Sequence, residues 1–118
     1  MKYNIITEKS MNFAIRVVNL YKYLRKEKSE FVLSKQLLRS GTSVGANIKE
    51  AVYGQSKKDF IAKMSISLKE IAETEYWLEL LFRTDYLTEK QYKDIAFDCS
   101  EIAKILITIV KNSKTVNC

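Results

Sequence analysis

The stretch YKDIAFDCSEIAKILITI, residues 92–109, decides the fold, because its large apolar side chains recur at alternating steps of three and four residues. Side chains at these steps lie on one face of an α-helix. The stretch therefore predicts an amphipathic helix with one buried face. The residues on that face are Tyr92, Ile95, Cys99, Ile102, Leu106 and Ile109.

Three further stretches upstream have the same helical period, so the sequence predicts helices over about 8–28, 34–54, 56–83 and from 88 onward. The connections between them are short, and short connections make successive helices antiparallel. The chain has no proline and only three glycines, which argues against a turn-rich β fold. We therefore predict one all-α domain over residues 1–118, folded as an antiparallel up-down-up-down four-helix bundle.

The predicted helix ends carry recognisable capping residues. Ser34 and Ser56 are each expected to cap a helix N-terminus, because a serine hydroxyl can accept a free backbone N–H there. Thr88 and Gln91 have the spacing of a capping box before the last helix. Gly54 is expected to end the second helix as a C-terminal cap.

Gly41 and Gly45 lie one turn apart inside the second predicted helix. A glycine in a helix interior costs about 1 kcal/mol relative to alanine, so a compensating interaction is expected. Close approach of a neighbouring helix is the simplest one. The alternative interpretation is a phosphate-binding loop over residues 41–45. This loop would lack the Gly-Lys-Ser/Thr ending and would interrupt a helical pattern, so we favour packing.

The chain has 20 basic and 14 acidic residues, a formal net charge of +6. A basic balance can indicate an anionic partner, but the basic residues are scattered and no run exceeds two, so from the charge alone we favour a solvated surface. A disulfide between Cys99 and Cys118 is not expected, which fits a reducing compartment. The N-terminal stretch becomes acidic at Glu8, too early for a signal peptide, and no apolar run is long enough to span a membrane. We therefore expect a cytoplasmic protein with no membrane partner.

The residue types that catalysis and metal binding need are scarce. There is no histidine, and two distant cysteines cannot form a zinc site, so we expect no catalytic residues, metal, cofactor or small-molecule substrate. Glu70 and Glu73 project together on the third helix and leave one enzymatic alternative, acid–base chemistry around a bound cation. Glu75 points toward the core stripe and is expected to need a polar partner there.

The third predicted helix has a second apolar face, which a solitary bundle would not need. It consists of Ala62, Ile66, Trp77 and Leu80, interleaved with Glu70 and Glu73. The first helix adds Met11, Ile15 and Val18 outside its own core stripe. Cover by a chain terminus or by lysine side chains is one explanation. We favour self-association, because exposed aromatic and aliphatic side chains mark protein interfaces.

A longer pattern resembles a known family. It comprises LRSGTSVGANIKEA (38–51), SKKDF (56–60) and KEIAETEYWL (69–78). The chain resembles the four-helix bundles encoded by intervening sequences in bacterial large-subunit ribosomal RNA genes, a family with a historical ribosomal-protein label. The resemblance implies a ring, typically a homopentamer. It also implies packing or subunit contacts for the matching residues Asn47, Glu50, Glu70, Glu73 and Trp77. Lys49 departs from the family pattern, which usually has alanine there.

Three functional hypotheses follow. A more distant relation, the accessory protein of diversity-generating retroelements, is a basic pentamer that works with a reverse transcriptase and RNA. By this analogy the leading hypothesis is a non-enzymatic homo-oligomer that binds RNA or a ribonucleoprotein. Lys57 and Lys58, at a helix N-terminus, would bind phosphate, and Arg39, Lys49 and Lys63 would extend the patch. A structural adaptor that recruits a protein partner is the second hypothesis, and the cation-dependent enzyme is the third.

Overall fold

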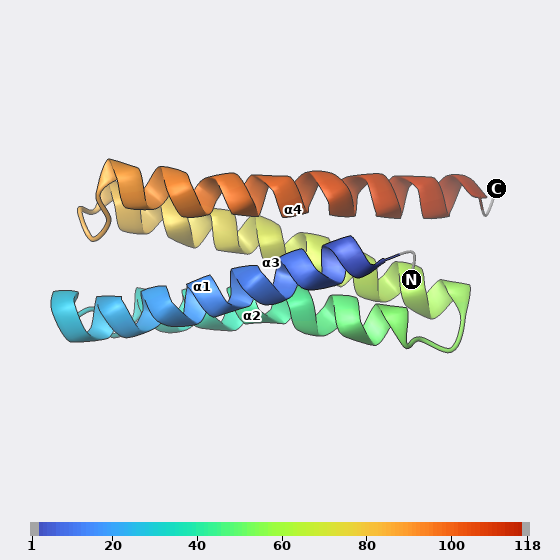
Figure 1. The fold of residues 1–118 in the computed structure, drawn as a ribbon, viewed down its shortest axis with the longest axis horizontal. Coiled ribbons are helices and arrows are strands. Elements are labelled where there is room, and N and C mark those ends of the chain that lie inside the picture. Colours follow the sequence, from blue (N-terminus) through green and yellow to red (C-terminus); the bar gives the residue numbers. More distant parts are fainter. Residues whose placement is uncertain (1–2, 117–118) are drawn as a thin grey trace.

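Four helices make up the described part of the chain, residues 3–116, in a computed structural model whose side chains are described through residue 113. The helices are α1 (Asn4–Lys28), α2 (Leu33–Val52), α3 (Lys57–Arg83) and α4 (Glu89–Val116). Successive helices run in opposite directions along a body of 48 × 22 × 20 Å (Figure 1). The predicted four-helix bundle is confirmed. Cys118, and with it the expectation of no disulfide, lies outside the described residues.

Each helix contributes one apolar stripe to a single core. The central buried side chains are Phe13, Val17, Leu24, Leu37, Val44, Ile48, Met64, Ile71, Leu78, Cys99, Ile102 and Leu106. The predicted stripe of α4 is therefore the buried one, with Tyr92 and Ile109 half-buried at its ends. Helix α1 begins one turn before the predicted start, because Ile6 continues the stripe and is buried. None of the described helices is long and apolar enough to cross a membrane.

The backbone of α2 approaches α1 closely at the two predicted glycines. A Cβ atom on Gly41 would lie 2.8 Å from both Cγ atoms of Val17, and a Cβ on Gly45 would lie 3.3 Å from Ser10 Oγ. The first distance is shorter than any ordinary carbon–carbon contact. The glycines therefore let α1 and α2 pack at a separation that a larger residue at 41 would prevent.

Two of the four predicted helix caps, at the starts of α3 and α4, are confirmed. Ser56 Oγ accepts a hydrogen bond from the backbone N–H of Asp59 at 3.0 Å and caps α3. Thr88 and Gln91 form the capping box of α4, with reciprocal hydrogen bonds of 2.9 and 3.1 Å. At the end of α2 the capping position belongs to Tyr53, and Gly54 follows it with a negative φ. Gly54 is needed for space, because a Cβ there would lie 2.6 Å from Asp59 Oδ2.

The prediction that Ser34 caps α2 is wrong. The side chain of Glu30 takes that role, because its carboxylate accepts hydrogen bonds from the backbone N–H groups of Val32, Leu33 and Ser34 at 3.1, 2.9 and 2.7 Å. Ser34 lies inside the helix and its hydroxyl donates to the carbonyl oxygen of Glu30. Burial by itself raises the pKa of Glu30, but the hydrogen bonds from Leu33, Ser34 and Val32 outweigh it and hold the pKa below its ordinary value of 4.5.

Replacing Glu30 with alanine is expected to lower the free energy of unfolding at pH 7 by about 1–2 kcal/mol, because three backbone N–H groups lose their acceptor. The folded-state pKa is depressed, so this stabilisation is complete above pH 4.5 and is lost as the pH falls through the folded-state value. Urea titrations of Glu30→Ala and wild type should therefore converge below pH 4.5. The control is Glu27→Ala, an exposed carboxylate nearby. An equal loss in both variants would contradict the capping role.

Helices α1 and α4 are joined much less tightly than the other neighbours. Figure 1 shows the two helices drawing apart toward the end of the molecule that holds the α1–α2 and α3–α4 turns, and α4 continuing past the start of α1 at the other end. Along this seam Lys9 Nζ lies 3.2 Å from Glu101 Oε1, and Arg16 pairs with Asp98. Both ion pairs are substantially exposed to solvent, so they contribute little to stability. The bundle thus has three well-packed seams and one loose seam.

Candidate functional site

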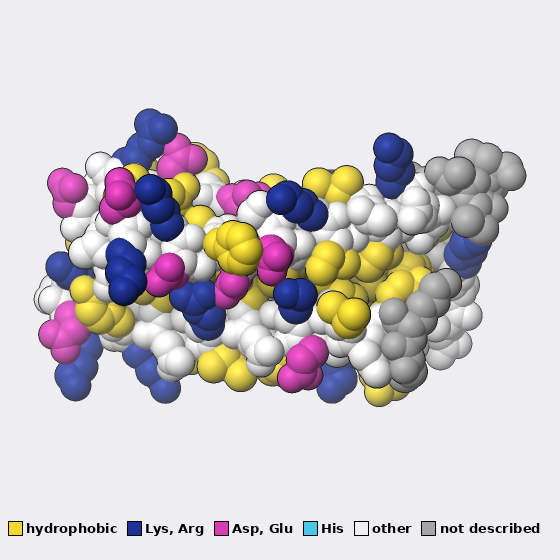
Figure 2. Space-filling model, turned by 45° about the horizontal axis from the view of Figure 1, so that its top comes forward, with side chains coloured by type: hydrophobic (Ala, Val, Ile, Leu, Met, Phe, Trp, Pro, Cys, Tyr) yellow, Lys and Arg dark blue, Asp and Glu magenta, His cyan; other side chains and the backbone are white. Residues whose placement is uncertain are grey.

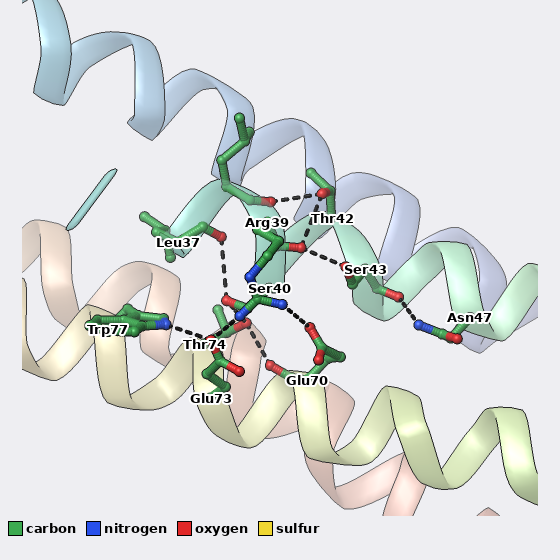
Figure 3. A network of polar contacts seen from close by, with 11 residues as sticks. Leu37, Arg39, Ser40, Thr42, Ser43, Asn47, Glu70, Glu73, Thr74 and Trp77 are labelled. Atoms are coloured by element: carbon green, nitrogen blue, oxygen red, sulfur yellow. Dashed lines mark hydrogen bonds and ion pairs between the residues drawn. The ribbon is translucent and has the colours of Figure 1, made fainter. Parts of the chain in front are cut away.

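A cluster of polar side chains, which we call the polar cluster, joins α2 to α3 and consists of Arg39, Glu70, Glu73 and Trp77 (Figure 3). Arg39 donates from Nη1 to Glu70 Oε2 at 3.1 Å and pairs through Nη2 with Glu73. The indole Nε1 of Trp77 donates to the same Glu73 carboxylate at 2.9 Å. One guanidinium therefore holds two carboxylates that lie one turn apart on α3.

A second layer of hydrogen bonds lies under the polar cluster, between the same helices. The buried hydroxyl groups of Ser40 and Thr74 are 2.9 Å apart, and Ser67 donates to the carbonyl oxygen of Val44 at 2.8 Å. Among the described side chains no buried nitrogen or oxygen atom is left without a partner. Both layers fix the register of α2 against α3.

The electrostatics of the polar cluster suit a structural contact. The hydrogen bonds from Trp77 and Arg39 hold the pKa of Glu73 below its ordinary value, so Glu73 is ionised at neutral pH. Hydrogen bonding to Glu73 in turn raises the pKa of Arg39. A carboxylate held this way is a poor proton donor, and the guanidinium occupies the place that the enzymatic alternative gave to a cation. Within residues 3–113 no three acidic or cysteine side chains gather as metal ligands would.

The expectation that Glu75 points into the core is wrong. Its side chain is exposed, and the neighbouring Thr74 takes the buried position on α3. Partial desolvation still raises the pKa of Glu75. Two further residues of the motif, Asn47 and Glu50, also have partners within the chain: Glu50 pairs with Lys63 of α3. Asn47 donates to the carbonyl oxygen of Ser43 at 2.8 Å.

The structure divides the predicted basic patch into two parts. Arg39 is paired within the polar cluster, and Lys63 forms an ion pair with Glu50 at 2.9 Å. The other predicted members, Lys49, Lys57 and Lys58, are exposed, and none of them pairs with an acidic side chain in the described part of the chain. These three lysines lie at one end of the bundle, where α2 turns into α3. We call this the lysine end.

Tyr53, which sequence reasoning left out of the patch, lies in the same turn and is 75% exposed. The lysine end therefore offers an aromatic ring beside its positive charges. No such combination was expected around these lysines from the sequence, because Tyr53 directly follows the apolar stripe of the second predicted helix.

The second apolar face of α3 is smaller than predicted. Ile66 is 42% exposed and Ala62 is exposed, but Trp77 and Leu80 are half-buried. Trp77 packs against the core and does not lie on the side opposite to it. Its hydrogen bond to Glu73 draws the indole toward α2, which explains the difference. Met11 and Ile15 of α1 are exposed as predicted, and Val18 is half-buried.

Three hollows follow the loose seam between α1 and α4. The largest of the three, with a volume of about 590 Å³, lies where α4 continues past the first turn of α1. Its lining residues are Tyr3, Ile5, Ile6, Lys57, Ile105, Thr108, Ile109, Asn112 and Ser113. Smaller hollows of about 160 and 330 Å³ lie near the two ion pairs. Hydrophobic side chains are visible in the hollowed surface toward this end of the molecule (Figure 2). This groove was not predictable from the sequence, because it depends on how two helices far apart in the chain lie against each other.

A cluster of aromatic and basic side chains at the turn between α1 and α2 was not predicted from the sequence. The guanidinium carbon of Arg25 lies 5.3 Å from the ring centre of Tyr21 and 5.0 Å from that of Phe31. Both distances are typical of cation–π contacts. The spacing of Tyr21 and Arg25, four residues apart on one helix, was a usable signal. The position of Phe31 was not predictable, because it depends on how the chain turns after α1.

Comparisons with known proteins agree with this geometry. The family model of the 23S rRNA-intervening sequence protein matches residues 2–108. A crystal structure of a protein of unknown function from the S23 ribosomal protein family of Bacteroides thetaiotaomicron superimposes on the chain with a TM-score of 0.92. The two sequences are 60% identical, and the match covers 94% of this chain and 99% of the other. No curated protein gives a significant match.

Proposed function

This chain belongs to the 23S rRNA-intervening sequence protein family, and we propose that it acts in the cytoplasm as a non-enzymatic homo-oligomer that binds RNA or a ribonucleoprotein. The proposed contact surface is the lysine end. The proposed ring of five subunits comes from the family resemblance.

The observation that carries the RNA-binding proposal is the set of unpaired lysines at the lysine end. Lys57 and Lys58 lie in the first turn of α3, where the helix dipole adds to their positive charge. Lys49 lies in the last turn of α2, close to the same end. Tyr53 supplies an exposed ring on which a base can stack. Positive charge beside an exposed aromatic ring is what proteins use to bind single-stranded nucleic acid.

Exposed apolar side chains on several helices support self-association. Met11 and Ile15 on α1, Ile66 on α3, and Phe97 and Ile107 on α4 are each at least 42% exposed. A second subunit that covers these side chains would remove apolar surface from water. Half-buried Trp77 and Leu80 would border such a contact, and Glu70 and Glu73 would remain in their pairing with Arg39.

Native mass spectrometry with an added oligoribonucleotide tests both parts of the proposal. The wild type is expected to give one closed oligomer with bound RNA. The double variant Lys57→Ala/Lys58→Ala should keep the subunit count. Solution titrations should show weaker binding and a salt dependence reduced by about 0.7 per lysine in the slope of log K against log salt. The variant should fold normally, because it removes two cations from the positive end of a helix dipole.

A matched control carries the same charge change elsewhere. Lys90 and Lys104 are exposed and lie outside the lysine end, so Lys90→Ala/Lys104→Ala should lower the affinity only through net charge. Equal losses in the two double variants would show that the lysine end is not the contact surface. A wild type that stays monomeric, or that binds no RNA even at low salt, would overturn the corresponding part of the proposal.

The largest hollow on the loose seam supports a second candidate, a structural adaptor that recruits a protein partner. Its lining includes Ile5, Ile6, Ile105 and Ile109, and its volume of about 590 Å³ suits an apolar side-chain group of a partner. Affinity capture from nuclease-treated lysate separates the two candidates. A stoichiometric protein that stays bound after nuclease treatment favours the adaptor, and loss of all bound material favours RNA.

A further inference from the structure

We propose that the turn between α1 and α2 is a second nucleic-acid site, which stacks the unpaired bases of single-stranded RNA. The site consists of Tyr21, Arg25 and Phe31, and the same segment carries the exposed residues Lys22, Lys26, Lys28 and Lys35. It lies at the opposite end of α2 from the lysine end, about 30 Å away for a helix of this length. The inference shares with the proposed function only the class of ligand.

Three planar side chains meet in this turn. The guanidinium of Arg25 makes cation–π contacts with both Tyr21 and Phe31, and its carbon lies 5.3 and 5.0 Å from the two ring centres. Phe31 is 49% exposed, and an exposed ring presents surface on which a planar ligand can stack. Unpaired bases stack on such rings and on arginine planes, whereas paired bases are already stacked on their neighbours. The geometry therefore selects unpaired bases over a duplex.

The backbone of the turn is held in place by hydrogen bonds, so Tyr21, Arg25 and Phe31 are in contact before a ligand binds. Ser29 ends α1 in the left-handed conformation with a φ of 51°, and the backbone N–H of Glu30 donates to the carbonyl oxygen of Leu24 at 3.0 Å. The Glu30 side chain then binds the first N–H groups of α2. Phe31 is held between these two constraints, which reduces the entropy lost when a base stacks on it.

The positive charge of the segment around these three side chains favours binding of a polyanion. Residues 21–35 include five basic and two acidic residues, so this short segment carries +3 of the chain's net charge of +6. One of the two acidic residues, Glu30, has its carboxylate occupied by backbone N–H groups. The four lysines of this segment, Lys22, Lys26, Lys28 and Lys35, are exposed, and none of the described residues forms an ion pair with them. They are free to contact phosphate groups.

An anionic membrane is the competing partner, because Val32 beside Phe31 is 70% exposed. A lipid surface needs apolar side chains of any shape next to lysines. It does not need an arginine in contact with two aromatic rings. The grouping of three planar side chains therefore favours nucleobases, and the experiment makes the membrane one of its outcomes.

The test uses fluorescence anisotropy with labelled oligouridine, the matching oligouridine–oligoadenine duplex and the full-length chain. Phe31→Leu keeps an apolar side chain but removes the ring, and it is expected to weaken oligouridine binding roughly tenfold. Duplex binding should be unchanged. Phe31→Tyr should retain the affinity for oligouridine, and Val32→Ala is the matched control on the same turn. Circular dichroism checks that every variant keeps its helix content.

The outcomes separate this inference from the proposed function. An unchanged affinity of Phe31→Leu for oligouridine, together with a loss in Lys57→Ala/Lys58→Ala, would overturn the stacking site and leave the proposed function intact. Wild type that binds no RNA would overturn both. Binding to phosphatidylserine vesicles that is lost in both Phe31→Leu and Val32→Ala, with RNA binding unaffected, would assign the turn to a membrane.

Discussion

Replacing Gly41 with leucine is expected to lower the free energy of unfolding by about 3 kcal/mol or more. A Cβ at this position already lies 2.8 Å from two methyl carbons of Val17, and Val17 is fully buried. The side chain has no space to enter, so α1 must move away from α2 along a stretch of the core. Urea unfolding followed by circular dichroism measures the loss. At low stability the same variant should expose the core and aggregate.

Two milder variants test the cause. Gly45→Ala places a Cβ 3.3 Å from Ser10 Oγ, so it should cost far less than Gly41→Ala or should stabilise through helix propensity. Adding Val17→Ala to Gly41→Ala should restore part of the loss, because the two clashing methyl groups are then absent. Additive effects of Val17→Ala and Gly41→Ala would show that the two residues do not compete for space.

Cys99 is expected to react with a thiol reagent at least about a thousandfold more slowly in the native protein than in urea. The side chain is fully buried in the core, and its Sγ lies 3.7 Å from the carbonyl oxygen of Ile71. Burial, followed by the charges of Glu75 and Asp98, raises the pKa of the thiol well above its ordinary value. The reactive thiolate is therefore scarce, and the reagent must wait for unfolding, which costs about 5 kcal/mol or more in a stable domain.

The measurement uses Cys118→Ser, so that Cys99 is the single thiol in the chain. Its labelling rate should rise with urea in parallel with the loss of helix. A Cys99 that reacts within seconds in native buffer would mean that α4 opens without global unfolding. Combining Cys118→Ser with Gly41→Leu should accelerate labelling in proportion to the lost stability.

The fold was predictable because its main signals are local. The apolar stripe from Tyr92 to Ile109 can be recognised from the periodicity of one helix. The caps at Ser56 and Thr88 can be recognised from the three residues that follow each of them. The wrong prediction for Ser34 has the opposite cause. Glu30 lies in the polar connection before α2, where sequence patterns do not indicate a cap. Ser34, beside the apolar residues of the helix, was therefore predicted as the cap instead.

The candidate site was less predictable, because it depends on pairs that lie far apart in the chain. Arg39 meets Glu70 and Glu73, which follow it by 31 and 34 residues, and no pattern within one helix contains this pairing. The sequence-based prediction of a basic patch therefore included Arg39 as a cation without an acidic partner. The helical-wheel projection of α3 placed Glu75 on the face toward the core. That placement was wrong by one residue, because the neighbouring Thr74 occupies the buried position. A position that differs by 100° of rotation changes from core to solvent.

The loose seam has a thermodynamic consequence for the two helices beside it. Helix α1 is attached firmly along α2 alone and α4 along α3 alone, so these two should have lower opening free energies than α2 and α3, and their backbone amides should exchange with deuterium first. A ligand bound in the hollow beside Ile105 and Ile109 would fill the gap between α1 and α4. Binding would therefore stabilise α4, and the melting temperature of the protein should rise with the ligand concentration.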